Sequence, residues 1–190
     1  MQQKTITIVS GLPRSGTSMM MKILEAGGLE VLTDNIRTAD EDNPKGYYEY
    51  ERVKALDDDT AWLDDAIGKV VKIISALIMK LPSAYHYKII FMQRNMEEIL
   101  SSQRKMLERR GEPTDTIHDE EMTAAFRDHL VKVEKWLNSN SNVDFLYVNY
   151  NDTIIHPKEN VRKINEFLGD RLNEDKMLAA IDKALYRNKQ

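Results

Sequence analysis

The residues with the clearest chemical potential are Gly11 to Ser18, which read GLPRSGTS. Glycines allow successive backbone N–H groups to turn toward one point, and a helix that begins at Gly16 adds the positive end of its dipole. The segment is therefore predicted to bind a phosphate or a related anion. Its spacing is that of a Walker A loop, although Thr17 occupies the position where those loops have lysine. The alternative is an ordinary strand-to-helix turn with two glycines.

Two cations could act on a transferred group. Arg14 lies within the loop, where a fixed guanidinium could contact the transferred group or the leaving phosphate as charge develops. Lys72 lies in the apolar run KVVKII, so its ammonium must find an anion or bear a desolvation penalty. Both are therefore catalytic candidates. The alternatives are a surface arginine and a lysine that extends from a strand end into solvent.

Arg94 follows the apolar run YKIIFMQ, and Ser102 comes eight residues later. In a parallel α/β sheet, ligands gather beyond the carboxyl ends of the strands, where this arginine is expected. Its planar guanidinium can hold two phosphate oxygens, and Ser102 could approach the same group from the next helix. The alternative is an ion pair of Arg94 with Glu97 or Glu98 at the start of that helix.

Glu49 is the leading candidate for a general base, which must reach the proton of an acceptor hydroxyl or amine. Three tyrosines close to it could line an apolar pocket: Tyr47, Tyr48 and Tyr50. An equally good interpretation places Glu49 at the N-terminus of a helix, where it would complement the helix dipole. His118 is the second candidate base, although its polar surroundings favour a surface position.

The composition excludes several classes of chemistry. The chain has 190 residues and no cysteine, which excludes disulfides, thiolate metal sites and thiol nucleophiles. With 27 basic and 31 acidic residues the net charge is −4, so neither nucleic acid nor a membrane is an expected partner. Five aspartates between residues 57 and 65 spread around a helix, which favours a solvated acidic face over a metal site.

The length and hydropathy set the domain organisation. A chain of 190 residues is predicted to form one domain over residues 1–190. The apolar stretches are far shorter than the ~18–20 residues that span a bilayer, and residues 1–10 do not have the pattern of a signal peptide. The protein is therefore expected to be cytoplasmic.

The elements that must position these residues alternate between strands and helices. This order predicts an α/β fold, a parallel sheet with helices on both faces. The predicted strands are Thr5–Ser10, Leu29–Thr33, Lys69–Ile74, Tyr87–Gln93 and Asp144–Asn149. The predicted helices are Gly16–Ala26, Glu51–Ala66, a turn at Leu77–Leu81, Met96–Arg109, His118–Leu137, a helix from Pro157 to Gly169, and Leu172–Arg187. Asp34–Tyr50 is predicted to be a surface loop.

A phosphoryl-transfer enzyme would need more than the loop. Such enzymes place a loop lysine on the β- and γ-phosphates and an acidic residue at the end of an apolar strand to hold magnesium. Here KVVKII continues into Ser75, and YKIIFMQ ends at Arg94. A nucleoside or small-molecule kinase is therefore the weaker alternative.

Four segments occur in order along the chain: PRSGTS in the loop, the stretch NPKGYYE from Asn43 to Glu49, Arg94 with Ser102, and VNYNDTIIHPKENVRKINEFLG from Val148 to Gly169. Together they resemble the sulfotransferases that use 3′-phosphoadenosine 5′-phosphosulfate (PAPS) as donor. The resemblance spans about residues 5 to 170. It implies a P-loop NTPase-like sulfotransferase fold and the transfer of a sulfuryl group to a hydroxyl or amine of a small molecule or peptide.

The resemblance also implies roles for individual residues. The loop would wrap the 5′-phosphosulfate through Pro13, Arg14, Ser15, Gly16, Thr17 and Ser18. Arg94 and Ser102 would hold the 3′-phosphate, and Lys72 would stabilise the developing charge. No metal is required, because a sulfuryl group carries less charge than a phosphoryl group.

Two departures from the family pattern limit this carry-over. Cytosolic members have a KTH stretch whose histidine is the base, whereas this chain has Lys72-Ile73-Ile74. Their C-terminal KGxxGxWK loop has no counterpart here. A non-catalytic protein that binds PAP (3′,5′-adenosine diphosphate) or another nucleotide therefore stays as a further alternative.

Overall fold

The sheet has four parallel strands in the order β2-β1-β3-β4. The computed structural model describes residues 4–34, 48–113 and 118–181. The strands are β1 (Thr5–Gly11), β2 (Val70–Lys72), β3 (His86–Gln93) and β4 (Val143–Asn149). Residue Val9 pairs with Lys72 on one side of β1 and with Ile90 on the other, so three carboxyl ends meet at one edge.

The central strands form because their residues are β-branched and buried on both sides. Ile6, Ile8 and Val9 in β1 are fully buried, as are Ile89 and Ile90 in β3. Parallel strands covered by helices on both faces read as continuous apolar runs, and TITIVSG and HYKIIFMQ are runs of this kind. The sheet is therefore a rigid base for the loops at its carboxyl edge.

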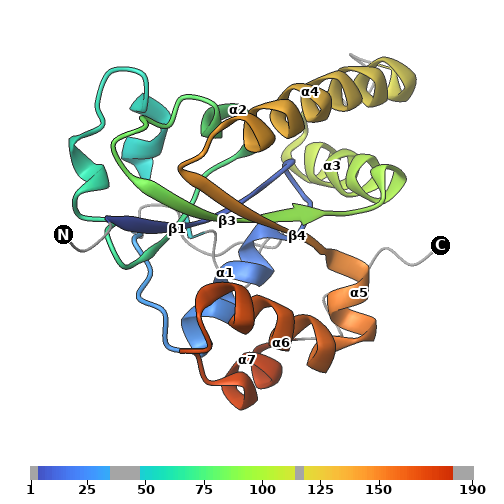
Figure 1. Cartoon of the computed structure of the whole chain (residues 1–190). Helices are drawn as coiled ribbons and strands as arrows, with labels where there is room; N and C mark the ends of the chain where they lie inside the picture. Colours follow the sequence, from blue (N-terminus) through green and yellow to red (C-terminus); the bar gives the residue numbers. More distant parts are fainter. Residues whose placement is uncertain (1–3, 35–47, 114–117, 182–190) are drawn as a thin grey trace.

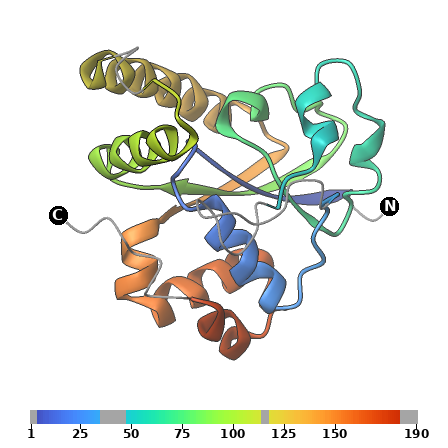
Figure 2. The same cartoon turned by 180° about the vertical axis from the view of Figure 1, so that it is seen from behind.

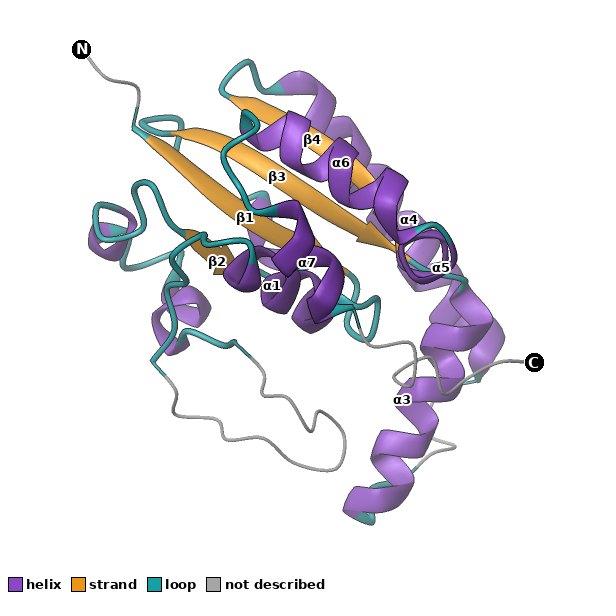
Figure 3. Ribbon diagram, turned by 90° about the horizontal axis from the view of Figure 1, so that it is seen from below, coloured by secondary structure: helices purple, strands orange, loops and turns teal. Residues whose placement is uncertain are grey.

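Helices cover both faces of the sheet, as the sequence predicts (Figure 1). On one face lie α1 (Thr17–Ala26), α5 (Tyr150–Ile155), α6 (Pro157–Leu168) and α7 (Glu174–Ala180), and α1 packs beside α7 (Figure 2). On the other lie α2 (Ser75–Ile78), α3 (Met96–Arg110) and α4 (Asp119–Ser139). Each face has its own apolar core, and α3 extends beyond the carboxyl end of the sheet (Figure 3).

Three predictions in the first half of the chain are wrong in detail. Residues 29–33 contribute an isolated bridge between Val31 and Val70 instead of a strand. The strand predicted over residues 69–74 is limited to β2. The helix predicted over residues 51–66 is replaced by two 3-10 helices, η1 (Glu51–Ala55) and η2 (Ala61–Leu63). The Asp59 carboxylate accepts the Ala61 N–H, and this local bond competes with a continuous helix.

The C-terminal part differs at two places. Helix α5 was not predicted; it begins directly after β4, where the Asn149 side chain accepts the N–H groups of Asn151 and Asp152. Helix α7 is shorter than the predicted Leu172–Arg187: Asn173 caps its start, and Ile181 has an extended backbone. Residues 182–190 lie outside the described part of the chain. No helix in the described ranges is long and apolar enough to cross a membrane.

Candidate active site

The loop between β1 and α1 has the backbone of an anion-binding turn. Gly11 and Gly16 have φ values of 150° and 100°, and α1 begins at Thr17. A Cβ built on Gly16 would lie 2.3 Å from Cδ2 of Tyr150, so position 16 has no room for a side chain. Arg14 also has a left-handed backbone, with φ of 70°. Pro13 is exposed, and Thr17 and Ser18 lie half-buried in the first turn of α1.

The Ser15 hydroxyl marks the interior of this loop. Ser15 is 1% exposed, and its Oγ has no hydrogen-bond partner among the described residues. The same Oγ lies 2.5 Å from where a Cβ on Gly11 would be, so the hydroxyl is turned toward the glycine at the loop's start. Because a buried hydroxyl without a partner is costly, a group that accepts or donates a hydrogen bond here would be stabilised.

Arg14 and Ser102, which were predicted to bind different groups of the donor, are joined by a hydrogen bond. The Arg14 Nε donates a hydrogen bond to Ser102 Oγ over 2.9 Å, across 88 residues of sequence. The backbone carbonyl of Arg14 in turn accepts a hydrogen bond from Nη1 of Arg94 at 3.0 Å. Two side chains from the β3–α3 segment are therefore attached to one residue of the loop.

Arg94 has a fixed position at the start of α3. Its Nε donates to Glu98 Oε2 at 2.8 Å, and the two side chains are only 7% and 11% exposed. Its guanidinium carbon lies 4.3 Å from the centroid of the Tyr150 ring. Asn151 donates its side-chain N–H to the other oxygen of Glu98 at 2.9 Å. The ion pair weighed as an alternative role for Arg94 is thus present, and it holds the guanidinium beside the loop.

Lys72 and Glu49, both predicted to be catalytic, lie together on the other flank of the loop. The Lys72 Nζ is 3.8 Å from Glu49 Oε1, and the side chains are 9% and 29% exposed. Lys72 therefore does not extend into solvent from its strand end. Glu49 precedes η1 and is not part of a helix. The two candidates are a cation and a carboxylate within ion-pair distance at the carboxyl end of β2.

The residues around Glu49 fix its backbone. Its carbonyl accepts a hydrogen bond from the Thr33 hydroxyl at 2.8 Å. On one side, the Tyr48 hydroxyl donates to Glu25 Oε2 of α1 at 2.6 Å; on the other, the rings of Tyr50 and Trp62 pack edge to face at 5.5 Å. Residues 43–47 of the NPKGYYE stretch, Tyr47 included, lie outside the described part of the chain. The segment that carries the predicted base is thus anchored on both sides.

One polar pair near this edge was missed by the sequence analysis. Ser75 is buried at the start of α2, and its Oγ lies 2.9 Å from Nε2 of His129 on α4. Burial, and to a lesser extent the charge of Lys132, lowers the pKa of His129. The available signal was the spacing of His129 four residues before the core residue Val133. His118, the second candidate base, is exposed next to the first turn of α4. It is not among the residues that contact the loop in the hydrogen bonds and ion pairs described above.

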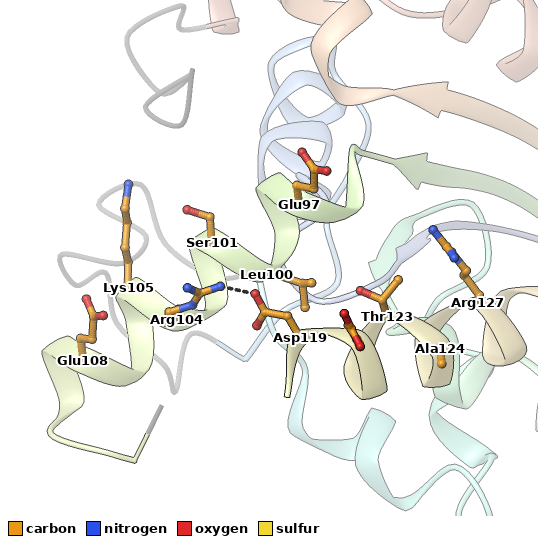
Figure 4. Close-up of a pocket in the computed structure, with 11 residues that line it drawn as sticks. Glu97, Leu100, Ser101, Arg104, Lys105, Glu108, Asp119, Thr123, Ala124 and Arg127 are labelled. Carbon is orange, nitrogen blue, oxygen red and sulfur yellow. Dashed lines mark hydrogen bonds and ion pairs between the residues drawn. The ribbon is translucent and has the colours of Figure 1, made fainter. Parts of the chain in front are cut away.

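Two hollows border α3. A cavity of about 350 Å³ lies between the loop, β3, α3 and α4, and is lined mainly by apolar side chains together with Ser15, Gln93, Arg94 and Glu134. A groove of about 700 Å³ separates α3 from α4 and is lined by charges of both signs. Figure 4 shows Arg104 of α3 and Asp119 of α4 joined across this groove. The groove therefore has a lining of mixed charge and is not a purely basic patch.

No group of three or more His, Asp or Glu side chains that could hold a metal ion occurs within residues 4–34, 48–113 and 118–181. Three of the five aspartates between residues 57 and 65 pair instead with single cations: Asp57 with Lys80, Asp59 with Arg52, and Asp64 with Lys4.

Comparison with known proteins decides the family. A family model described as a sulfotransferase domain matches residues 4–190. The chain belongs to the sulfotransferase domain family. Its structure is similar to the sulfotransferase domain from the curacin biosynthetic pathway, with a TM-score of 0.56 and 13% sequence identity over 96% of this chain and 79% of that chain. No curated protein matches the sequence.

The comparison confirms the resemblance drawn from the sequence at the level of family and fold. The four-stranded parallel sheet flanked by helices is a sulfotransferase fold. Within this sulfotransferase domain, the loop, the Lys72–Glu49 pair and the Arg94–Ser102 segment meet at one edge of the sheet. Ligands of parallel α/β sheets bind at this edge.

Proposed function

We propose that the protein is a PAPS-dependent sulfotransferase that moves a sulfuryl group to a hydroxyl or amine of a small-molecule or peptide acceptor. One observation carries the proposal. The loop with the buried Ser15 hydroxyl lies between a cation–carboxylate pair suited to transfer, Lys72 with Glu49, and a group of side chains suited to a phosphate, Arg94 with Ser102.

The loop residues fit the 5′-phosphosulfate of the donor. The positive φ values of Gly11 and Gly16 and the start of α1 at Thr17 supply backbone N–H groups for an anion. The Ser15 hydroxyl would gain the hydrogen bond that it does not make to any described residue. On the flank next to α3, Arg94 and Ser102 would hold the 3′-phosphate.

Glu49 and Lys72 would act on the reacting atoms. The bond between sulfur and the oxygen that bridges it to the 5′-phosphate breaks, and a bond forms between sulfur and the acceptor oxygen or nitrogen. PAP leaves with the electron pair on that bridging oxygen, where Lys72 stabilises the charge. The Glu49 carboxylate takes the acceptor proton, in place of the KTH histidine that this chain does not have.

The test is a comparison of ligands by thermal shift and of donors by product formation. A ligand that binds the native state raises its stability in proportion to the logarithm of its concentration over Kd. We expect PAP to raise the melting temperature without magnesium, and 5′-AMP and ADP, which have no 3′-phosphate, to do so much less. Consumption of PAPS with an acceptor present is expected to release PAP.

The outcomes separate the three candidate functions. A shift with ATP that appears only with magnesium would instead support a kinase. Tight PAP binding without transfer to any hydroxyl or amine in an acceptor panel would support a non-catalytic PAP-binding protein. Equal shifts for PAP and 5′-AMP would contradict the 3′-phosphate site.

A further inference from the structure

Tyr48, which directly precedes Glu49, has a backbone conformation that is rare for a large side chain. Its φ is 53°, in the left-handed region, where a bulky residue is an outlier. Such a conformation persists only where the surrounding contacts fix it, and it occurs preferentially at functional sites. The contacts of Tyr48 therefore indicate what its strained backbone serves.

The side chain of Tyr48 is fixed on α1. Its ring is half-buried and packs against the apolar core on the α1 face of the sheet. Its hydroxyl donates a hydrogen bond of 2.6 Å to Glu25 Oε2, near the end of α1. Burial, and to a lesser extent the bond to Glu25, raises the pKa of the Tyr48 hydroxyl, so this group stays a donor near neutral pH. The bond thus joins residue 48 to the helix that begins at the loop.

The two residues after Tyr48 contact other elements. Glu49 lies 3.8 Å from Lys72 at the carboxyl end of β2, and the Tyr50 ring packs against Trp62. Three consecutive side chains therefore reach three different elements: α1, β2 and η2. Because the peptide bond holds consecutive Cα atoms about 3.8 Å apart, a shift of Tyr48 moves Glu49 with it.

The carbonyl group of Glu49 is fixed by a different route. It accepts a hydrogen bond from the Thr33 hydroxyl at 2.8 Å. The chain just before Thr33 is bonded to β2, where the Leu32 N–H donates to the Val70 carbonyl at 2.9 Å. The carbonyl of Glu49 is thus tied to the strand that carries Lys72, and the preceding side chain is tied to α1. Attachment on both sides of Glu49 limits the directions that its carboxylate can take.

We infer that Tyr48 is a positioning residue: the bond of its hydroxyl to Glu25 holds the Glu49 carboxylate within ion-pair distance of Lys72. The bond also joins the proposed base to the helix that begins at the donor loop. The catalytic consequence rests on the proposed function, because it requires Glu49 to act as the base. The arrangement of the side chains does not depend on that function, so the two can be tested separately.

A carbodiimide tests the arrangement, because this zero-length reagent joins an amine to a carboxylate only where the two are in contact. Tyr48→Phe removes the hydroxyl and keeps the ring. We expect it to lower the yield of the Lys72–Glu49 cross-link, measured by mass spectrometry, by about 10-fold, the factor for one hydrogen bond to a charged group. The Lys163–Glu159 cross-link on α6 is the internal standard and should keep its yield.

The matched control is Tyr85→Phe. Tyr85 also donates a hydrogen bond to an exposed carboxylate, that of Asp64, and it lies next to the amino end of β3. The same substitution there removes the same kind of bond at the opposite edge of the sheet. It should leave the yield of the Lys72–Glu49 cross-link at the wild-type level.

Variants of Glu25 separate the hydrogen bond from other effects of residue 48. Glu25→Gln keeps an oxygen that can accept from the Tyr48 hydroxyl, and should keep most of the cross-link. Glu25→Ala removes the acceptor and should lower the yield as far as Tyr48→Phe does. The double variant with Tyr48→Phe should fall no further, because both changes remove one bond.

Kinetics with PAPS, and with 4-nitrophenol as the probe acceptor, test the catalytic consequence. We expect Tyr48→Phe to lower kcat by about 10-fold and to leave the KM for PAPS near wild type. In the background of Glu49→Gln, Tyr48→Phe should lower kcat no further, because Tyr48 acts through the Glu49 carboxylate. A role in stability alone would lower kcat by the same factor in both backgrounds.

The inference is overturned if Tyr48→Phe or Glu25→Ala keeps the wild-type yield of the Lys72–Glu49 cross-link. It is also overturned if the Lys163–Glu159 standard and the melting temperature fall together with that yield, which would indicate a general loss of stability. A wild-type protein that forms the Lys72–Glu49 cross-link but neither binds PAP nor transfers a sulfuryl group would refute the proposed function and leave the arrangement of Tyr48 intact.

Discussion

One cation–carboxylate pair lies on each side of the loop, and the two pairs differ in distance, in the burial of the carboxylate and in their further contacts. Arg94 and Glu98 are 2.8 Å apart and nearly buried, and further contacts from Tyr150 and Asn151 fix both side chains. Lys72 and Glu49 are 3.8 Å apart, come from different segments, and leave Glu49 29% exposed. The Arg94–Glu98 pair is therefore a fixed part of the fold, whereas the Glu49 carboxylate of the other pair is exposed enough for a ligand to reach it.

The difference matches the two roles that the proposed function gives to the two flanks of the loop. A short, buried and further hydrogen-bonded pair keeps its geometry, which suits the recognition of a phosphate in one position. In the Lys72–Glu49 pair the separation of 3.8 Å is longer than a direct hydrogen bond and Glu49 is 29% exposed, so a third group can approach the carboxylate. The comparison predicts that replacement of Glu49 lowers mainly the rate of transfer, whereas replacement of Glu98 lowers the stability of the protein and its donor binding.

Replacement of Glu49 should give the largest effect, and on turnover. We expect Glu49→Gln to lower the rate of sulfuryl transfer by about 10²- to 10⁴-fold, as for a lost general base, while PAP affinity stays near wild type and stability falls less than on replacement of Glu98. Steady-state kinetics with PAPS and an identified acceptor measure this. Glu51→Gln is the matched control, because Glu51 pairs with Lys54 on the surface. A wild-type rate for Glu49→Gln would remove the base role from this residue.

Replacement of Glu98 should act on stability and donor binding. Glu98→Gln leaves the Arg94 guanidinium without its buried counter-charge, and we expect the free energy of unfolding to fall by about 2–3 kcal/mol. Urea denaturation measures the change, and Glu97→Gln, an exposed neighbour on α3, is the control. If Glu49→Gln destabilised the protein as much as Glu98→Gln, the contrast between the two pairs would not hold.

The smallest expected effect concerns His129, which lies near neither pair in the hydrogen-bond network. Its pKa is lowered by burial and by Lys132, so the unfolded chain binds a proton at a higher pH than the folded protein does. The free energy of unfolding should therefore fall as the pH drops through the ordinary histidine pKa of about 6.5. In His129→Gln this pH dependence should be reduced, whereas His118→Gln should keep it. Equal slopes in all three proteins would contradict the assignment.

The features that the sequence predicts best are those formed by residues close together in the chain. The loop, the strands around it and the start of α3 follow from glycine spacing and from apolar runs, and each is confirmed by the structure. The Arg94–Glu98 pair was also among the sequence-based alternatives, because Arg94 comes just before a helix whose first turn has two glutamates. Each of these features is formed by residues that are close together in the sequence, so a local sequence pattern can predict it.

The sequence predicts poorly what depends on contacts between distant segments. Tyr150 and Asn151 belong to α5, a helix of six residues that begins directly after a strand and has too few positions to show a helical period. The segment of residues 51–66 forms two short helices instead of one, and the hydrogen bond from the Ala61 N–H to the Asp59 carboxylate lies between them. The pairing of Ser75 with His129 joins residues 54 positions apart, and no spacing rule contains it.

Because the ring of Tyr150 packs against Gly16, one contact that fixes the loop can form only late in synthesis. The ribosome makes the loop first, but the residues that fix it follow 80 to 88 positions later at Arg94 and Ser102, and later still at Tyr150. Strands β1 and β3 can pair before α5 has left the ribosome, because chains fold as their segments emerge. A nascent chain that ends directly before Tyr150 would therefore contain all four strands and the complete loop sequence, but not the ring that packs against Gly16.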